Sequence, residues 1–410
     1  MTIELLTASG RELLDRLSGE DAGPDRALEL AQALRGRYPP GLVATALTQR
    51  ALREAARAKF SRAARMLFTR DGLEQASSEV TGSHAAARFP AGWLVADLCC
   101  GIGGNLIALA AERRVLAVDK DPVSLAFARH NAGVYGAADG LAVVCADARE
   151  VVLSGVDAVF IDPARRAGGQ RLPAGRSDPP LDWCLALAGR VPAAGIKAAP
   201  GLPRELVPAG WEAEFVAVGR DLKEALLWSP ALASATRRAT VLPSGDTLAA
   251  SAASRADPVT APPGAPAASP VAGPGASGSG VPVAQPGAYL LDPSPAVTRA
   301  GLVEELARQL GAWKIDPQIA FLSANRELRT PFARTLRVLE SASWHERHFA
   351  RRLRDLGIGA ADIRRRGLAG DVAQIHRRLD LRGTGRATVV ITRARGRPWG
   401  LVCTEMSEDG

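Results

Sequence analysis

The stretch Val95–Asn105, which reads VADLCCGIGGN, constrains the fold more than any other part of the chain. An apolar run, Trp93–Leu98, carries one acid, Asp97, and breaks into a glycine-rich turn. An apolar helical pattern, Leu106–Ala111, follows at once. This order of strand, turn and helix holds a small ligand at the carboxyl end of a strand. The chain is therefore expected to fold around a parallel α/β sheet with a ligand site at its edge.

The residues of the turn indicate which ligand binds. Gly101, Gly103 and Gly104 do not have the G-x-G-x-x-G spacing that brings a dinucleotide pyrophosphate onto a helix N-terminus. Asp97 places a carboxylate where a pyrophosphate would be repelled and an ammonium group would be attracted. S-adenosylmethionine has an ammonium group and no phosphate, so we interpret the stretch as its site, and an NAD site is disfavoured.

Short apolar runs that predict strands alternate with helical patterns from Trp93 onward, as in a parallel α/β sheet. Four successive predicted strands end at or just before an aspartate, namely Asp97, Asp119, Asp147 and Asp162. In a parallel sheet these ends lie along one edge, where α/β proteins bind ligands. Asp119 is placed to accept both ribose hydroxyls of a nucleoside. Asp147, with the amide of the next residue, suits the amine and ring nitrogen of adenine.

Three segments carry a family resemblance: Asp97–Asn105, Val118–Pro122 and Ala128–Gly136, which read DLCCGIGGN, VDKDP and ARHNAGVYG. They resemble the core of class I S-adenosylmethionine-dependent methyltransferases and are most similar to the trimethylguanosine synthase branch of RNA methyltransferases. The resemblance covers about residues 95–165. It implies a Rossmann-like methyltransferase sheet and S-adenosyl-L-methionine as the cofactor.

The resemblance also implies roles for individual residues. Residues of the turn and of the following strand ends would hold the donor: Asp97, Cys99, Gly101, Gly103, Gly104, Asn105, Asp119, Lys120, Asp147 and Ala148. Asp162, Pro163 and Arg165 would form the catalytic loop. In amino-methyltransferases this loop has a second proline and an aromatic residue, where this chain has Ala164 and Arg165. The Arg165 guanidinium can stack on a base or hold a phosphate.

The same loop bears on the type of reaction. Residues 162–165 also resemble the loop of RNA 5-methyluridine methyltransferases, which use a cysteine nucleophile after the fifth strand. The corresponding residues here, 196–200, include no cysteine, which disfavours a covalent mechanism. Direct in-line transfer to a nitrogen or oxygen remains, with Asp162 as hydrogen-bond acceptor or weak base.

The charge distribution points to a nucleic-acid partner. The formal net charge is +8, and fourteen arginines against five acidic residues lie between His345 and Arg397. This basic segment has the electrostatic footprint of an RNA-binding arm. The segment from Arg352 to about Val402 resembles the THUMP-like domain attached to bacterial methyltransferases of this kind.

Other sequence features suggest a cytoplasmic protein. No apolar run reaches the roughly 18 residues of a membrane span, and the N-terminus does not resemble a secretory signal. The five cysteines include no C-x-x-C pair, so neither a zinc site nor a disulfide framework is predicted. No metal, no membrane contact and no particular oligomeric state are indicated.

We expect an α/β protein, with a Rossmann-like class I methyltransferase sheet between an N-terminal helical region and a small C-terminal α+β domain. The expected parts are a helical region at 1–90, the methyltransferase domain at 91–248, a disordered Ala/Pro/Gly/Ser-rich linker at 249–287, a helical connector at 288–340 and a basic THUMP-like domain at 341–410. Helices are predicted within them over Arg26–Leu34, Val43–Arg53, Ala55–Leu67 and Arg299–Leu310.

The leading hypothesis is an S-adenosylmethionine-dependent methyltransferase that methylates a base nitrogen in RNA. Two alternatives stay open. The acceptor is a small molecule or a protein, or the chain is a catalytically inactive RNA-binding protein. The second alternative draws on the unusual residues Ala164 and Arg165 of the loop.

Overall fold

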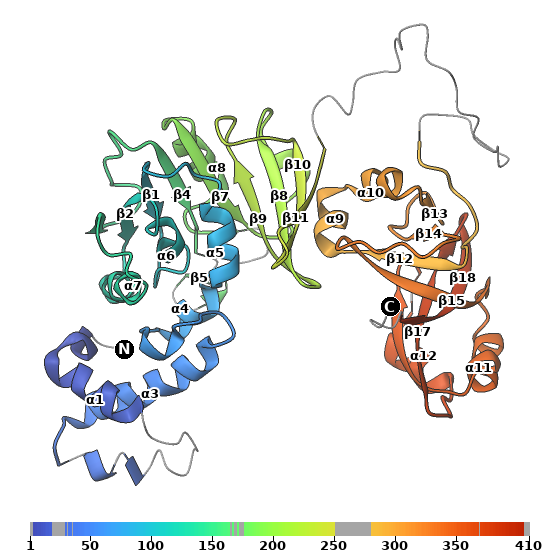
Figure 1. Cartoon of the computed structure of the whole chain (residues 1–410), viewed down its shortest axis with the longest axis horizontal. Coiled ribbons are helices and arrows are strands. Elements are labelled where there is room, and N and C mark those ends of the chain that lie inside the picture. Colours follow the sequence, from blue (N-terminus) through green and yellow to red (C-terminus); the bar gives the residue numbers. More distant parts are fainter. Residues whose placement is uncertain are drawn as a thin grey trace, which may run out of the picture. The chain divides into compact units, whose positions relative to one another are not determined.

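The computed structural model describes residues 3–18, 29–30, 32–34, 36–164, 166–167, 170–171, 176–250, 280–368 and 370–405 (Figure 1). The chain divides into two compact units, of which the first comprises Met1–Val218 and Lys223–Ser234, and the second Gly219–Leu222 and Ala235–Gly410. Most of the expected linker, residues 251–279, lies outside the described residues. None of the described helices has the length and apolar composition needed to cross a membrane.

The first unit is built on a parallel sheet extended by antiparallel strands. Its strands are β1 (Leu94–Leu98), β2 (Arg114–Asp119), β3 (Leu141–Cys145), β4 (Ala158–Ile161), β7 (Ala193–Ala198), β8 (Glu212–Val218) and β9 (Asp221–Trp228). They run in the order β8-β9-β7-β4-β1-β2-β3. The five strands from β7 to β3 are parallel, and β9 pairs antiparallel with β7. The predicted strands are therefore present, with the strand-ending aspartates along one edge of the sheet.

Helices connect and cover these strands. They are α6 (Leu106–Leu109), α7 (Pro122–Val134), α8 (Leu181–Ala188) and the 3-10 turn η3 (Arg204–Leu206), while two short strands, β5 (Arg166–Ala167) and β6 (Gln170–Arg171), pair with each other. Helix α7 begins at Pro122, because Asp121 caps it and Pro122 occupies its first turn. The Asp121 carboxylate accepts hydrogen bonds from the amides of Val123 and Ser124.

The N-terminal region is helical but differs in detail from the prediction. Its elements are η1 (Ile3–Leu6), α1 (Ala8–Ser18), α3 (Pro40–Ala56), η2 (Ala63–Arg65), α4 (Arg70–Gln75) and α5 (Glu79–Ala86). The predicted helix Ala55–Leu67 is wrong, because α3 ends at Ala56 and the chain turns there. Lys59, in that turn, donates to the carbonyl oxygens of Leu73, Glu74 and Ala76 at the end of α4. The predicted helix Arg26–Leu34 lies only partly within the described residues.

The second unit corrects the expected helical connector at 288–340. That segment contributes β12 (Tyr289–Pro293), β13 (Trp313–Lys314), β14 (Leu322–Ala324) and most of β15 (Ala333–Ser343). These strands share one sheet with β16 (Ile358–Arg365), β17 (Gly385–Ala394) and β18 (Arg397–Glu405), in the order β13-β14-β12-β15-β18-β17-β16. Strand β15 is only partly buried, and polar residues alternate along it, so it contains no apolar run that would have predicted a strand.

The remaining elements of the second unit are α9 (Pro295–Ala300), α10 (Val303–Leu310), α11 (Glu346–Asp355), α12 (Val372–Arg378) and the hairpin of β10 (Arg237–Leu242) and β11 (Asp246–Ala250). The predicted helix Arg299–Leu310 is two helices. Gly301 ends α9 with a left-handed φ of 66°, a conformation that glycine adopts at little cost.

Asn131 fixes the N-terminal region to the ligand edge of the sheet. Its side chain, in α7, is fully buried. Its Oδ1 accepts from the Leu67 amide at 2.8 Å, and its Nδ2 donates to the carbonyl oxygens of Leu67 and Ile102, each at 2.9 Å. Leu67 precedes α4 and Ile102 lies in the glycine turn. One side chain therefore joins three segments that surround the turn.

We predict that Asn131→Ala lowers the free energy of unfolding by about 3 kcal/mol, because it leaves buried backbone groups without partners. Urea unfolding followed by circular dichroism measures the change. The matched control is Arg129→Ala, an exposed position on the same helix, which should alter the free energy by less than about 0.5 kcal/mol. Equal effects of the two substitutions would contradict the role assigned to Asn131.

Candidate active site

The glycine turn after β1 has a backbone that only small residues allow. Cys99, Gly101 and Gly103 have positive φ angles of 63°, 55° and 92°. A Cβ added at Gly104 would lie 2.9 Å from backbone atoms of Ser77, so this glycine permits close contact with the N-terminal region. A Cβ at Gly101 would meet no atom within 4 Å, because Gly101 faces open space. The turn is thus packed on one side and open on the other.

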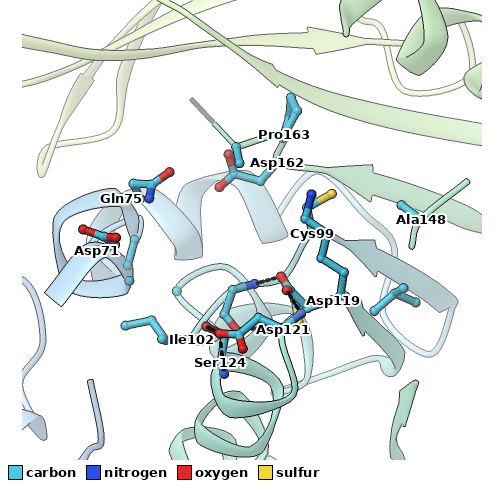
Figure 2. A pocket seen from close by; sticks show the side chains of 18 of the residues that line it. Asp71, Gln75, Cys99, Ile102, Asp119, Asp121, Ser124, Ala148, Asp162 and Pro163 are labelled. Atoms are coloured by element: carbon cyan, nitrogen blue, oxygen red, sulfur yellow. Dashed lines mark hydrogen bonds between the residues drawn. The ribbon is translucent and has the colours of Figure 1, made fainter. Parts of the chain in front are cut away.

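That open space is a pocket of about 610 Å³ at the carboxyl ends of β1 to β4 (Figure 2). Ten of the residues predicted from the sequence line it: Cys99, Gly101, Gly104, Asn105, Asp119, Lys120, Asp147, Ala148, Asp162 and Pro163. Gly103 does not line the pocket but packs against α7, where its Cβ would lie 3.2 Å from the Ala128 Cα. Arg165 lies outside the described residues.

Asp119 is held rigidly at the end of β2. Its Oδ2 accepts from the amide of Gly101 at 2.8 Å, and its Oδ1 accepts from the amide of Asp121 at 2.9 Å. Burial raises the pKa of this carboxyl group, although the two backbone hydrogen bonds oppose the shift. Each oxygen keeps a further lone pair, so the group can accept hydrogen bonds from the hydroxyls of a ribose.

Asp97 occupies a different environment from the one expected. It is completely buried in β1 and is not among the residues that line the pocket. Neither carboxylate oxygen has a hydrogen-bond partner among the described residues. Burial raises the pKa of Asp97 well above its usual range, the carboxylates of Asp162 and Asp119 add to this, and Lys197 opposes it. A buried carboxylate without a partner is costly, and a nearby ligand cation would offset that cost.

These observations fit S-adenosylmethionine. The acidic side chains of Asp97, Asp119 and Asp162 match its positive charges, and the space above Gly101 admits a ligand close to the backbone. The turn therefore suits a cationic ligand better than a pyrophosphate.

Asp162 lies at the end of β4 and points into the pocket (Figure 2). Its Oδ2 accepts from Asn105 Nδ2 and from Lys197 Nζ, each at 2.9 Å. Sequence reasoning placed Asn105 and Asp162 at the site without pairing them, and it missed Lys197. The signal was present, since a lysine in the otherwise apolar strand Ala193–Ala198 is unusual in a chain with five lysines.

A chain of ion pairs lies at the adenine end expected for the pocket. Asp147 is 3.1 Å from Arg149, Arg149 is 2.6 Å from Asp178, and Lys120 is 2.8 Å from Asp178. Hydrogen bonds from Lys120 and Arg149 lower the pKa of Asp178. Asp147 is thus already engaged by Arg149. Sequence reasoning missed Asp178, which comes from the segment after the catalytic loop, where no strand-end pattern marks it.

The N-terminal region supplies a wall that sequence reasoning also missed. Asp71 and Gln75 of α4, followed by Ser77, line the pocket. In Figure 2, Asp71 and Gln75 lie on one side of the view and Ala148 on the other, with Asp162 and Pro163 between them. The pocket therefore extends past the strand ends to α4, which gives it room for a donor and for part of an acceptor.

The comparisons with known proteins agree with this geometry. The family described as RNA cap guanine-N2 methyltransferase matches residues 93–168, and the THUMP domain-like family matches residues 333–405. A domain of unknown function matches residues 3–56. The first two matches confirm the resemblances drawn from the sequence, one at the glycine turn and its neighbours and the other at the C-terminal sheet.

Whole-chain similarity extends further. An uncharacterised S-adenosylmethionine-dependent methyltransferase, found in two strains of Mycobacterium tuberculosis, is 36% identical over 352 residues, which span 80% of this chain and 84% of the relative. A Porphyromonas gingivalis protein assigned as a methyltransferase has a crystal structure that aligns with a TM-score of 0.74 at 21% identity, covering 97% of this chain and 99% of that one. The first comparison shows the family, and the second shows the fold. The chain belongs to the S-adenosylmethionine-dependent methyltransferases.

Proposed function

We propose that the enzyme methylates a base nitrogen in RNA by direct in-line transfer, with Asp162 at the acceptor. Asp162 carries this proposal, because none of the described residues donates a hydrogen bond to its Oδ1, while Oδ2 is held by Asn105 and Lys197. An oxygen held in this way can accept a hydrogen bond from the amino or imino group of a base. S-adenosylmethionine, when bound, supplies the electrophilic methyl group.

Residues of this chain then have separate tasks. The backbone at Gly101–Gly104 would hold the ammonium end of the donor, the buried Asp97 behind it would offset the positive charge, and Asp119 would hold the ribose. Ala148 would lie against the adenine, within reach of Asp147 and its partner Arg149. Together these contacts would align the methyl group with the acceptor, which is the main contribution of an enzyme to a reaction of this type.

The second unit supports RNA as the acceptor. Arg347, Arg351 and Arg354 follow one another at helical spacing on α11, opposite the buried Phe349 and Leu353. All three arginines are exposed, and the first two form no ion pair with any described residue. Arginines free on one helix face are available to phosphates. The THUMP domain-like match covers this helix, and the RNA cap guanine-N2 methyltransferase match covers the pocket.

Transfer of radiolabel tests the proposal. The enzyme and radiolabelled S-adenosylmethionine are mixed with the RNA, protein and small-molecule fractions of the cells that encode the enzyme. We expect label in RNA, sensitive to ribonuclease and carried on an N-methylated base. Label in protein or small molecules alone would replace RNA with another acceptor. Donor binding by calorimetry without any label transfer would favour an inactive RNA-binding protein.

A second prediction concerns the arginines of α11. Arg347→Ala with Arg351→Ala should weaken RNA binding and reduce the slope of log affinity against log salt by about 2, since each arginine would neutralise one phosphate. Filter binding at several salt concentrations measures both quantities. Arg57→Ala with Arg129→Ala removes the same charge from two exposed positions in the first unit, one in the turn after α3 and one on α7, and should leave the slope unchanged. Equal slopes for all three proteins would contradict RNA binding by this face.

A third prediction concerns Asp97. Its raised pKa in the folded protein means that the folded state binds more protons than the unfolded state above about pH 3.9, so that stability falls as pH rises toward the folded pKa. The difference in free energy of unfolding between Asp97→Asn and the donor-free wild type should therefore grow in favour of the variant by about 1.4 kcal/mol per pH unit within that window. Urea unfolding at pH 5, 6 and 7 measures it.

The same variant should bind S-adenosylmethionine at least about tenfold more weakly in calorimetry, because its amide cannot pair with the ammonium group. Asp139→Asn, at an exposed position, is the control and should change neither quantity. A stability difference that is independent of pH, or unchanged donor affinity, would argue against the role given to Asp97.

A further inference from the structure

A lysine buried behind the pocket joins three elements of the first unit. Lys197, in β7, is 7% exposed. Its Nζ donates to Ser77 Oγ at 2.7 Å and to Asp162 Oδ2 at 2.9 Å, and lies 3.4 Å from Glu224 Oε2. These partners belong to the segment between α4 and α5, to the end of β4 and to β9. Lys197 does not line the pocket, so it can affect the reaction only through its neighbours.

The charges around Asp162 show what this lysine offsets. Asp97 from β1 and Glu224 from β9 both place carboxyl groups near it, and Lys197 from β7 supplies the paired cation. Glu224 is itself buried, which raises its pKa, and Lys197 opposes that shift. Lys197 is therefore the cation that offsets the carboxylates of Asp162 and Glu224.

The geometry explains why both charge and position matter. Asn105 and Lys197 both bind Oδ2 of Asp162, whose side chain is 23% exposed, and no described residue donates to Oδ1. We propose that Lys197 is a positioning residue that fixes Asp162 through Oδ2, so that Oδ1 faces the acceptor as a hydrogen-bond acceptor. This inference rests on the role proposed for Asp162 in methyl transfer.

Ser77 and Glu224 position the lysine in turn. Glu224 sits beside Nζ on the side of the sheet core, and Ser77 lies beside Gly104, close to the glycine turn. An ammonium group that contacts three oxygens from three elements has little freedom to move to another partner. The N-terminal region therefore helps to orient the carboxylate at the reaction centre, although its sequence carries no methyltransferase motif.

The decisive measurement does not require the acceptor. Aspartate labelled with ¹³C at the carboxyl carbon is introduced into the full chain, and Asp162 is assigned by its loss in Asp162→Asn. In Lys197→Met the chemical shift of the Asp162 carboxyl carbon should change and its signal should broaden, because Oδ2 loses the ammonium group that fixes it. In Lys197→Arg the chemical shift should change less, because the positive charge is kept. Lys223→Met, which removes an exposed lysine one residue from Glu224, should leave the Asp162 signal in place. An unchanged Asp162 signal in Lys197→Met would overturn the inference.

Activity and stability separate positioning from support of the fold. With the RNA fraction as acceptor, Lys197→Met should lower kcat at least tenfold and change the donor Kd less than twofold. The double variant Lys197→Met with Glu224→Gln removes both buried charges and should recover stability in urea without recovering kcat. Recovery of kcat together with stability would make Lys197 a structural residue. If the wild type labels no RNA, the proposed function fails, and the carboxyl signal of Asp162 still decides the role of Lys197.

Discussion

The repulsion among carboxylates at the ends of β1, β2 and β4 is the constraint on which the rest of the first unit depends. A parallel sheet brings the ends of its strands to one edge, and here that edge carries Asp97, Asp119 and Asp162. The three carboxylates differ in their partners. Asp119 receives two backbone amides, Asp162 receives Asn105 and Lys197, and Asp97 has no partner among the described residues. The remaining negative charge favours a ligand with positive charge, which S-adenosylmethionine has.

The N-terminal helices form part of this site and do not only pack beside it. Asn131 ties Leu67 to the glycine turn, and Lys59 binds the end of α4. Ser77 lies close to Gly104 and accepts a hydrogen bond from Lys197. The pocket wall formed by α4 is thus fixed to the sheet by polar contacts that are buried or partly buried. Such contacts are strong where water is excluded, so the wall and the strand ends should behave as one body.

Much of the first unit could be predicted from the sequence, because its information is local. The spacing of Asp97, Gly101 and Gly103 reports a strand followed by a turn, and Asp121-Pro122 reports the start of a helix. Contacts between distant segments could not be predicted in this way. The segments that carry Lys197, Asp178 and Ser77 have no sequence motif that marks them as part of the site. Strand β15 was not predicted, because it is partly exposed and lacks an apolar run. Most of the residues predicted for the donor line the pocket, and their roles stay predictions, whereas the residues that support them were not predicted.

The unusual residue Ala164, in the loop after Asp162, is explained by the contacts of Asp178. The amide of Ala164 donates to the Asp178 carbonyl oxygen, and the Asp178 amide donates back to Ala164, each at 2.9 Å. A second proline at position 164, as in the amino-methyltransferases that the loop resembles, would have no amide hydrogen and would lose the first of these bonds. The side chain of Asp178 meanwhile joins Lys120 and Arg149. Alanine at 164 therefore allows the loop that carries Asp162 to be tied to the ion pairs at the adenine end. In this chain, backbone hydrogen bonds between Ala164 and Asp178 fix the loop at the position where the loop that it resembles has a second proline.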